Sequence, residues 1–265
     1  MIKLVISNQR GGVAKTTTTA TLARILAERG RRTLAVDADP QGSLGLVLGL
    51  KPVRYFHDFA LGHRGLEDCV VRAAPRLDVL CGSRETSKLD AAWSGGQEPQ
   101  FSLAARFGPV TDRYDAVLFD TAPSVSLVQT CALIYAGRVL IPAAMDMLSL
   151  QGAVACCETA RLLNEIYRAD VEPLGLLPVM VDRRFNLTAY VMGALEEMSE
   201  RFRVPLLGVI RTDGTVPRAE RAKQFLADYD GSSKALEDYH RAADQILELP
   251  AMRQDAEWQR QAIPA

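Results

Sequence analysis

Short runs of apolar and β-branched residues alternate with longer helical patterns along most of this sequence. The strand-like runs lie at 2–6, 33–36, 77–80, 116–119, 139–141, 174–181 and 206–210, and the helical patterns lie near 16–29, 125–136, 149–168, 187–202 and 233–248. Such alternation is typical of βαβ units, in which helices cover both faces of a mostly parallel sheet. The sequence therefore predicts a three-layer α/β fold, with less regular structure over 43–112.

The length and the remaining composition narrow the class of protein. The 265 residues suit one large α/β domain, which we expect over 1–250, followed by a polar tail over 251–265. No apolar run approaches the roughly 18–20 residues of a membrane span, and the first strand leaves no room for a signal peptide. The five cysteines lack paired spacing and the three histidines are scattered. This usage argues against a zinc site and favours a reducing, cytoplasmic location.

A glycine-rich loop lies between the first strand and the first helical pattern. It reads Gln9-Arg10-Gly11-Gly12-Val13-Ala14-Lys15-Thr16-Thr17. Glycines let the main chain curl so that successive N–H groups point at phosphate oxygens, and the positive end of the following helix faces the same anion. A lysine can reach the β- and γ-phosphates, and a threonine hydroxyl can ligate Mg²⁺. The sequence therefore predicts a phosphate-binding loop, although Gln9 and Ala14 occupy positions that are usually glycine.

This loop resembles the deviant Walker motif x-K-G-G-x-x-K-[ST] of the ParA/MinD family of ATPases. Arg10 stands where the family has a signature lysine, which reaches the ATP of a partner subunit across a dimer. Arginine keeps the positive charge and offers a planar fork to phosphate oxygens. The resemblance implies a P-loop NTPase fold, a homodimer in the ATP state and catalytic roles for Arg10 and Lys15. The expected nucleotide contacts are Arg10, Gly11, Gly12, Val13, Ala14, Lys15, Thr16 and Thr17.

Two further segments strengthen the resemblance. Residues 36–43 resemble the family's V-D-x-D-P-Q-G segment, and residues 114–124 resemble its Walker B strand. The first match implies that Asp39 orients the attacking water or acts as its base, a role that suits a carboxylate at the end of a strand. The second implies that Asp120 holds Mg²⁺ together with Thr16. The family precedent is a slow ATPase that a partner protein stimulates.

The C-terminal half contains two weaker matches and a group of basic residues; the first match is residues 181–187, which resemble the family's D-x-R-x-N segment. Residues 210–219 resemble the family segment that borders the adenine, which implies contacts from Arg211 and Asp213. In ParA-type members a basic surface holds nucleoid DNA without sequence preference, as phosphate contacts alone would do. We expect the DNA contacts to be Arg183, Arg184, Arg218 and Arg221.

The leading interpretation is a cytoplasmic, nucleoid-associated ATPase that partitions or positions a cargo. The cargo class includes a plasmid, a chromosome or a protein organelle, and the expected adaptor is a ParB-like or small protein. A MinD-like membrane-site regulator is an alternative, but the tail offers few bulky apolar residues for a membrane. An ATP-binding scaffold with little hydrolysis stays open because of Arg10. Enzymes resembling dethiobiotin synthetase, and reductases with an iron–sulfur cluster, match the sequence less well.

Overall fold

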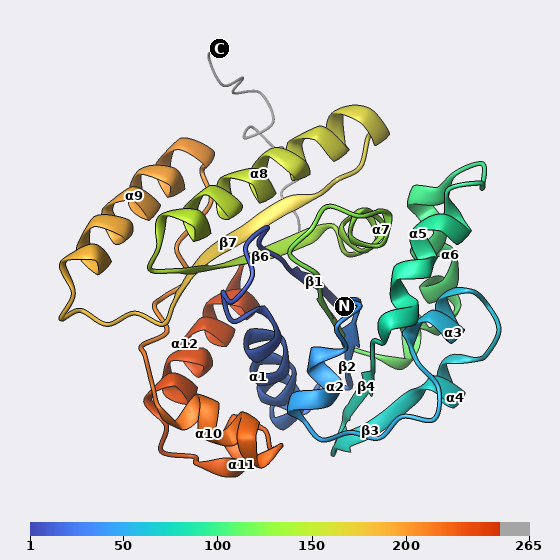
Figure 1. The fold of residues 1–265 in the computed structure, drawn as a ribbon, viewed down its shortest axis with the longest axis horizontal. Coiled ribbons are helices and arrows are strands. Elements are labelled where there is room, and N and C mark those ends of the chain that lie inside the picture. The colour runs from blue at the N-terminus through green and yellow to red at the C-terminus, as the bar shows by residue number, and fades with distance from the viewer. Residues whose placement is uncertain (250–265) are drawn as a thin grey trace.

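A seven-stranded sheet runs through the centre of the computed structural model, which describes residues 1–249 except the side chains of 110 and 111 (Figure 1). The strand order is β3-β4-β2-β5-β1-β6-β7. Neighbouring strands pair in parallel, except that β3 is antiparallel to β4. The strands are β1 (Ile2–Ile6), β2 (Thr33–Asp37), β3 (Val70–Ala74), β4 (Leu77–Leu80), β5 (Ala116–Asp120), β6 (Arg138–Ala144) and β7 (Glu172–Val179).

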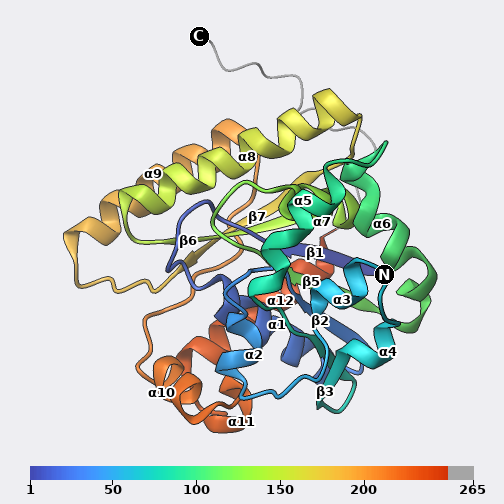
Figure 2. The same ribbon diagram turned by 45° about the vertical axis from the view of Figure 1, so that its right-hand side comes forward.

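Helices cover both faces of the sheet, which confirms the predicted three layers (Figures 1 and 2). One face holds α1 (Lys15–Glu28), α2 (Ser43–Val47), α10 (Thr215–Ala222), α11 (Leu226–Tyr229) and α12 (Lys234–Glu248). The other holds α3 (Phe56–Ala60), α4 (Leu66–Cys69), α5 (Lys88–Trp93), α6 (Ser102–Phe107), α7 (Leu127–Ala136), α8 (Met147–Tyr167) and α9 (Asn186–Phe202). Short 3₁₀ turns lie at Arg84–Ser87, Pro99–Phe101 and Gly108–Arg113.

The central strand β1 is apolar except for Lys3, whose Nζ donates to the oxygen of Tyr135. Leu4 and Ile6 pack into the core beneath α1 and α12, whereas Val5 packs into the core beneath α7 and α8. Successive side chains of a strand point to opposite faces. A strand that is covered on both faces therefore has no polar side, and β1 holds the loop that follows it at the middle of the molecule.

The five long predicted helices are confirmed within two residues at each end. Gly30 follows the end of α1 with φ of +84°, the left-handed conformation expected of a glycine just beyond a helix. Among residues 1–249, no helix combines the length and apolar character that crossing a bilayer requires. The predicted tail over 251–265 lies outside the described residues.

Two expectations about regular structure need correction. The predicted strand over 206–210 is not a regular strand: isolated bridges join Leu206 to Leu176 of β7 and Arg211 to Val181, beyond the end of β7. Gly208, with φ of +72°, interrupts the extended backbone between these bridges. The irregular region over 43–112 contains the short helices α2 to α6 and the antiparallel strand β3. Strand β3 lies at the sheet edge, where a short hairpin can add to a parallel sheet.

Candidate functional site

The glycine-rich loop connects the carboxyl end of β1 to the amino end of α1. Gly12 and Ala14 both lie in the left-handed region, with φ of +75° and +55°. Ala14 is the N-cap of α1, and no side chain caps the helix there. The first N–H groups of a helix have no partner inside the helix, and they carry the positive end of its dipole. The loop therefore leaves the start of α1 able to bind an anion.

Lys15 lies against the inner side of this loop. Its Nζ donates hydrogen bonds to the main-chain oxygens of Arg10 (2.8 Å) and Asn8 (3.2 Å). Burial lowers the pKa of Lys15, and the carboxylates of Asp120 and Asp39 oppose that shift. The ammonium group is thus held beside the loop, with acidic groups close enough to affect its charge.

Thr16 and Asp120 meet beside the carboxyl end of the central strand β5. The Thr16 hydroxyl donates a 2.7 Å hydrogen bond to Oδ2 of Asp120, the last residue of β5. Burial raises the pKa of Asp120 to about 7, although the hydrogen bond from Thr16 favours its ionised form. The other oxygen, Oδ1, is buried and has no hydrogen-bond partner among the described residues. A hydroxyl beside a carboxylate with an unpaired oxygen fits the oxygen ligands that Mg²⁺ prefers.

Asp39 lies in the turn that follows β2. Its Oδ1 accepts the main-chain N–H of Gln41 at 2.8 Å. The turn is fixed by the buried carboxylate of Asp37, which accepts the N–H groups of Asp39 (3.2 Å) and Leu44 (2.9 Å). Burial, together with the charge of Asp120, raises the pKa of Asp37 well above its ordinary value. Asp37 supports the site although the sequence reasoning gave it no role.

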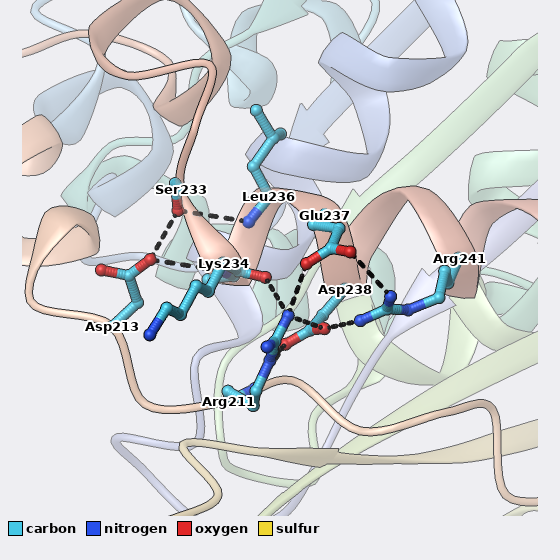
Figure 3. A network of polar contacts seen from close by, with 9 residues as sticks. Arg211, Asp213, Ser233, Lys234, Leu236, Glu237, Asp238 and Arg241 are labelled. Atoms are coloured by element: carbon cyan, nitrogen blue, oxygen red, sulfur yellow. Dashed lines mark hydrogen bonds and ion pairs between the residues drawn. The ribbon is translucent and has the colours of Figure 1, made fainter.

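A cavity of about 700 Å³ joins these residues to the C-terminal part of the chain. On one side it is lined by residues 11–17 and Asp39, and on the other by residues 210–214 and Glu220. The structure therefore brings the loop, Asp39 and the predicted adenine contacts, Arg211 and Asp213, around one space. The polar ends of those last two side chains bind α12 (Figure 3).

The other predicted residues lie around this cavity or away from it. Arg10 is exposed at the mouth of the loop, where its N–H donates to Asn8. Arg183 and Arg184 are exposed in the connection between β7 and α9, and Arg184 pairs with Asp182. Arg218 and Arg221 are exposed on α10, where Arg218 donates to the oxygen of Gly214. The predicted DNA contacts thus form two pairs on different elements.

Several supporting residues were missed because they are remote in sequence from the loop. The Thr17 hydroxyl donates to Glu220 at 2.7 Å, and the Thr18 hydroxyl lies 2.9 Å from the hydroxyl of Tyr239. These bonds join the first turn of α1 to α10 and α12. Neither Glu220 nor Tyr239 belongs to a recognisable motif, so only the fold identifies them.

The close contact between α8 and the start of the loop depends on Gly152. A Cβ at this position would lie 2.1 Å from Oδ1 of Asn8. Asn8 is fully buried, and its amide donates to the oxygens of Pro142 (2.8 Å) and Ser149 (3.1 Å). Its Oδ1 accepts the N–H of Arg10 at 3.0 Å. Asn8 therefore cannot move aside without losing bonds that shape the loop.

Replacing Gly152 by alanine is expected to lower the free energy of unfolding by about 1–3 kcal/mol, because it overpacks this contact. Urea denaturation of the nucleotide-free protein measures the change. Gly193→Ala in α9 is the matched control, because nothing lies within 4 Å of its added Cβ. There the better helix propensity of alanine should leave stability unchanged or raise it. Equal effects at the two glycines would contradict this account of Gly152.

The chain was compared with known proteins. Residues 1–172, more than half of the chain, match the family described as AAA domain. The chain is 31% identical over 246 residues to the chromosome partitioning protein ParA of Myxococcus xanthus, covering 89% of this chain and 84% of that one. A Mycobacterium smegmatis structure described as cobyrinic acid a,c-diamide synthase with bound ADP and magnesium is 27% identical, with a TM-score of 0.78 and coverage of 93% and 94%.

A third likeness concerns the fold alone. The structure of apo McdA from Cyanothece has a TM-score of 0.83 with 20% identity, over 93% of this chain and 99% of that one.

Three observations point to one family: the deviant loop, the carboxylates at the ends of β2 and β5, and the match to ParA. This chain belongs to the ParA/MinD family of P-loop ATPases.

Proposed function

We propose that this chain binds ATP with Mg²⁺, dimerises in that state and hydrolyses ATP slowly as a switch that positions a cargo on DNA. The observation that carries the proposal is the convergence of Lys15, the Thr16–Asp120 pair and Asp39 at the uncapped start of α1. These groups supply a cation for phosphates, a site for Mg²⁺ and a carboxylate for water. The ADP and magnesium in the M. smegmatis relative support the same ligands.

Each residue of the site has a distinct part in this proposal. The N–H groups of residues 11–17 cradle the phosphates, and Lys15 binds the β- and γ-phosphates. Thr16 and the unpaired oxygen of Asp120 hold Mg²⁺, which neutralises charge on the phosphates. Asp39 orients water for in-line attack. Arg10, whose side chain is exposed, is free to reach the nucleotide of a second copy.

Two measurements test the core of the proposal. Calorimetry with ATP and Mg²⁺ should show one binding site per chain. Light scattering should show a monomer without nucleotide and a dimer with ATP. Phosphate release then separates a switch from a scaffold: measurable turnover that an adaptor increases supports the switch, whereas dimerisation without turnover supports an ATP-binding scaffold. Absence of ATP binding would remove the proposed function altogether.

We expect the ATP-bound dimer to bind DNA without sequence preference, through Arg183, Arg184, Arg218 and Arg221. Charge reversal at Arg184 and Arg218 together should weaken binding at low salt by about tenfold or more, and should flatten its salt dependence, because each neutralised phosphate contributes to the slope. Fluorescence anisotropy at several salt concentrations measures both quantities.

Arg113→Glu is the matched control for the DNA experiment. Arg113 is also an exposed, ion-paired arginine. It precedes the amino end of β5, whereas the connection that bears Arg184 follows the carboxyl end of β7. This substitution should leave DNA binding within about twofold of the wild type. If the ATP-loaded protein does not bind DNA at low salt, or if Arg113→Glu weakens binding as much as the double charge reversal does, the proposed DNA-binding surface is wrong.

The membrane alternative has its own test. Sedimentation with vesicles of anionic lipid in the presence of ATP should leave this protein in the supernatant. Pelleting with the vesicles would favour a membrane-site regulator over a DNA-bound, nucleoid-associated ATPase.

A further inference from the structure

The segment that lines the far side of the cavity is attached to α12 by its side chains (Figure 3). Arg211 donates to Asp238 three times: from its main-chain N (2.9 Å), its Nε (2.8 Å) and its Nη2 (2.8 Å). Nη2 also donates to Glu237 at 2.7 Å. The guanidinium group of Arg211 is therefore engaged by α12, which sets the position of the Arg211 main chain.

Asp213 is attached to the same helix by a second set of bonds. Its Oδ2 accepts the Ser233 hydroxyl (2.8 Å) and the N–H of Ala235 (3.2 Å), and its Oδ1 accepts the N–H of Thr215 (2.8 Å). Both carboxylate oxygens are therefore occupied by groups of the protein itself. These bonds hold the Asp213 side chain against α12 and the start of α10.

Asp238 is the buried member of this network. Its side chain is 1% exposed, whereas that of Arg211 is 42% exposed. Burial opposes ionisation of Asp238, but the bonds from Arg211 and Arg241 keep its pKa below the ordinary value. A buried carboxylate that stays ionised must be fully hydrogen-bonded, so its position is closely defined.

The helix that bears Asp238 is itself fixed to the phosphate loop. Tyr239, the next residue, is buried and its hydroxyl lies 2.9 Å from that of Thr18 in the first turns of α1. At the other end of α12, Arg29, the C-cap residue of α1, pairs with Asp244 at 2.8 Å. A continuous path of packed groups thus relates the wall at 211–214 to the loop at 10–17.

We propose that Asp238 is a positioning residue for the base of the bound nucleotide: through Arg211 it holds the main chain of residues 211–214 at a set distance from the phosphate loop. The inference rests on the proposed binding of ATP. In this arrangement the main chain of the segment faces the purine, while the side chains of Arg211 and Asp213 face α12. Loss of Asp238 should therefore weaken the binding of ligands that have a base and leave the binding of ligands that have only phosphates unchanged.

The test compares ATP with inorganic tripolyphosphate, both with Mg²⁺, by calorimetry. For Asp238→Ala we expect the affinity for ATP and ADP to fall about tenfold, which corresponds to about 1.4 kcal/mol. The affinity for tripolyphosphate should stay within twofold. In turnover, KM for ATP should rise while kcat stays within twofold, since the phosphate chemistry is intact. If Asp238→Ala only damaged the fold, the affinities for both ligands would fall equally.

Matched variants separate this role from general damage to α12. Glu237→Gln removes an exposed partner of the same arginine and should change ATP affinity by less than twofold. Arg29→Ala removes the ion pair at the far end of α12 and should lower the melting temperature. It should change the affinities for ATP and tripolyphosphate by the same factor. Arg211→Gln should reproduce the effect of Asp238→Ala, and the double variant should add little.

Each outcome decides the proposal. If Asp238→Ala does not fold, Arg211→Gln supplies the same comparison from the exposed end of the pair. Unchanged ATP affinity, or parallel losses for ATP and tripolyphosphate, would overturn the positioning role while leaving the proposed function intact. If the wild type binds neither ligand, the proposed function fails first and this inference fails with it.

Discussion

Lys15→Ala should lower the affinity for ATP with Mg²⁺ by about 100-fold, which corresponds to about 2.8 kcal/mol. The reason is the position of the ammonium group. It is held at 2.8 Å from the oxygen of Arg10, within the loop that we propose binds the phosphates. Hydrogen bonds between charged groups are about twice as strong as neutral ones. Calorimetry with ATP measures the loss, and phosphate release should fall to background.

The control for Lys15 is Lys3→Ala. Lys3 is partly buried and also has a lowered pKa, but it belongs to β1 and its Nζ donates to the oxygen of Tyr135. It is expected to keep wild-type affinity for ATP. Because Lys15 also bonds the loop itself, Lys15→Met, which fills the same space, tests whether the fold or the charge is responsible. ATP binding by either Lys15 variant at wild-type strength would contradict the assignment.

The parts of this protein that the sequence predicted are those with a local signature. The strands β1, β2 and β5 are short, mostly apolar runs, and the loop before Lys15 is a contiguous motif. Hydrophobic periodicity and short motifs both act over neighbouring residues, so one sequence contains all the information needed. Resemblance to the family's motifs assigned Asp39 and Asp120 to the site, and their positions after β2 and at the end of β5 bring them beside the loop, because the carboxyl ends of parallel strands lie together.

The missed features depend on pairs that are far apart in the chain. Asn8 meets Gly152 and Thr17 meets Glu220 only after the sheet and helices have assembled. The orientation of Arg211 is a case in the site itself. Its segment was located at the cavity, but its guanidinium binds Asp238, 27 residues later. A carboxylate on an amphipathic helix looks solvent-exposed in sequence, and only burial of that turn of α12 shows otherwise.

Asp39→Ala should lower phosphate release by about 100-fold or more, within the range that general acid–base groups contribute. ATP binding should persist, because the groups assigned to the phosphates and Mg²⁺ lie in other elements. A protein that binds ATP without cleaving it remains in its ATP-bound form, so we expect a stable dimer by light scattering. Phosphate release and molar mass are measured on the same sample.

The contact that Asp39 makes in this structure gives the experiment its control. Its Oδ1 accepts the N–H of Gln41 at 2.8 Å, so alanine removes a turn contact as well as a carboxylate. Asn in place of Asp39 can still accept that N–H, but it cannot take a proton from water. If the carboxylate acts on water, both variants lose hydrolysis. Recovery of turnover in Asp39→Asn would assign the effect to the turn, and a monomeric Asp39→Ala protein with ATP would contradict the proposed order of binding, dimerisation and hydrolysis.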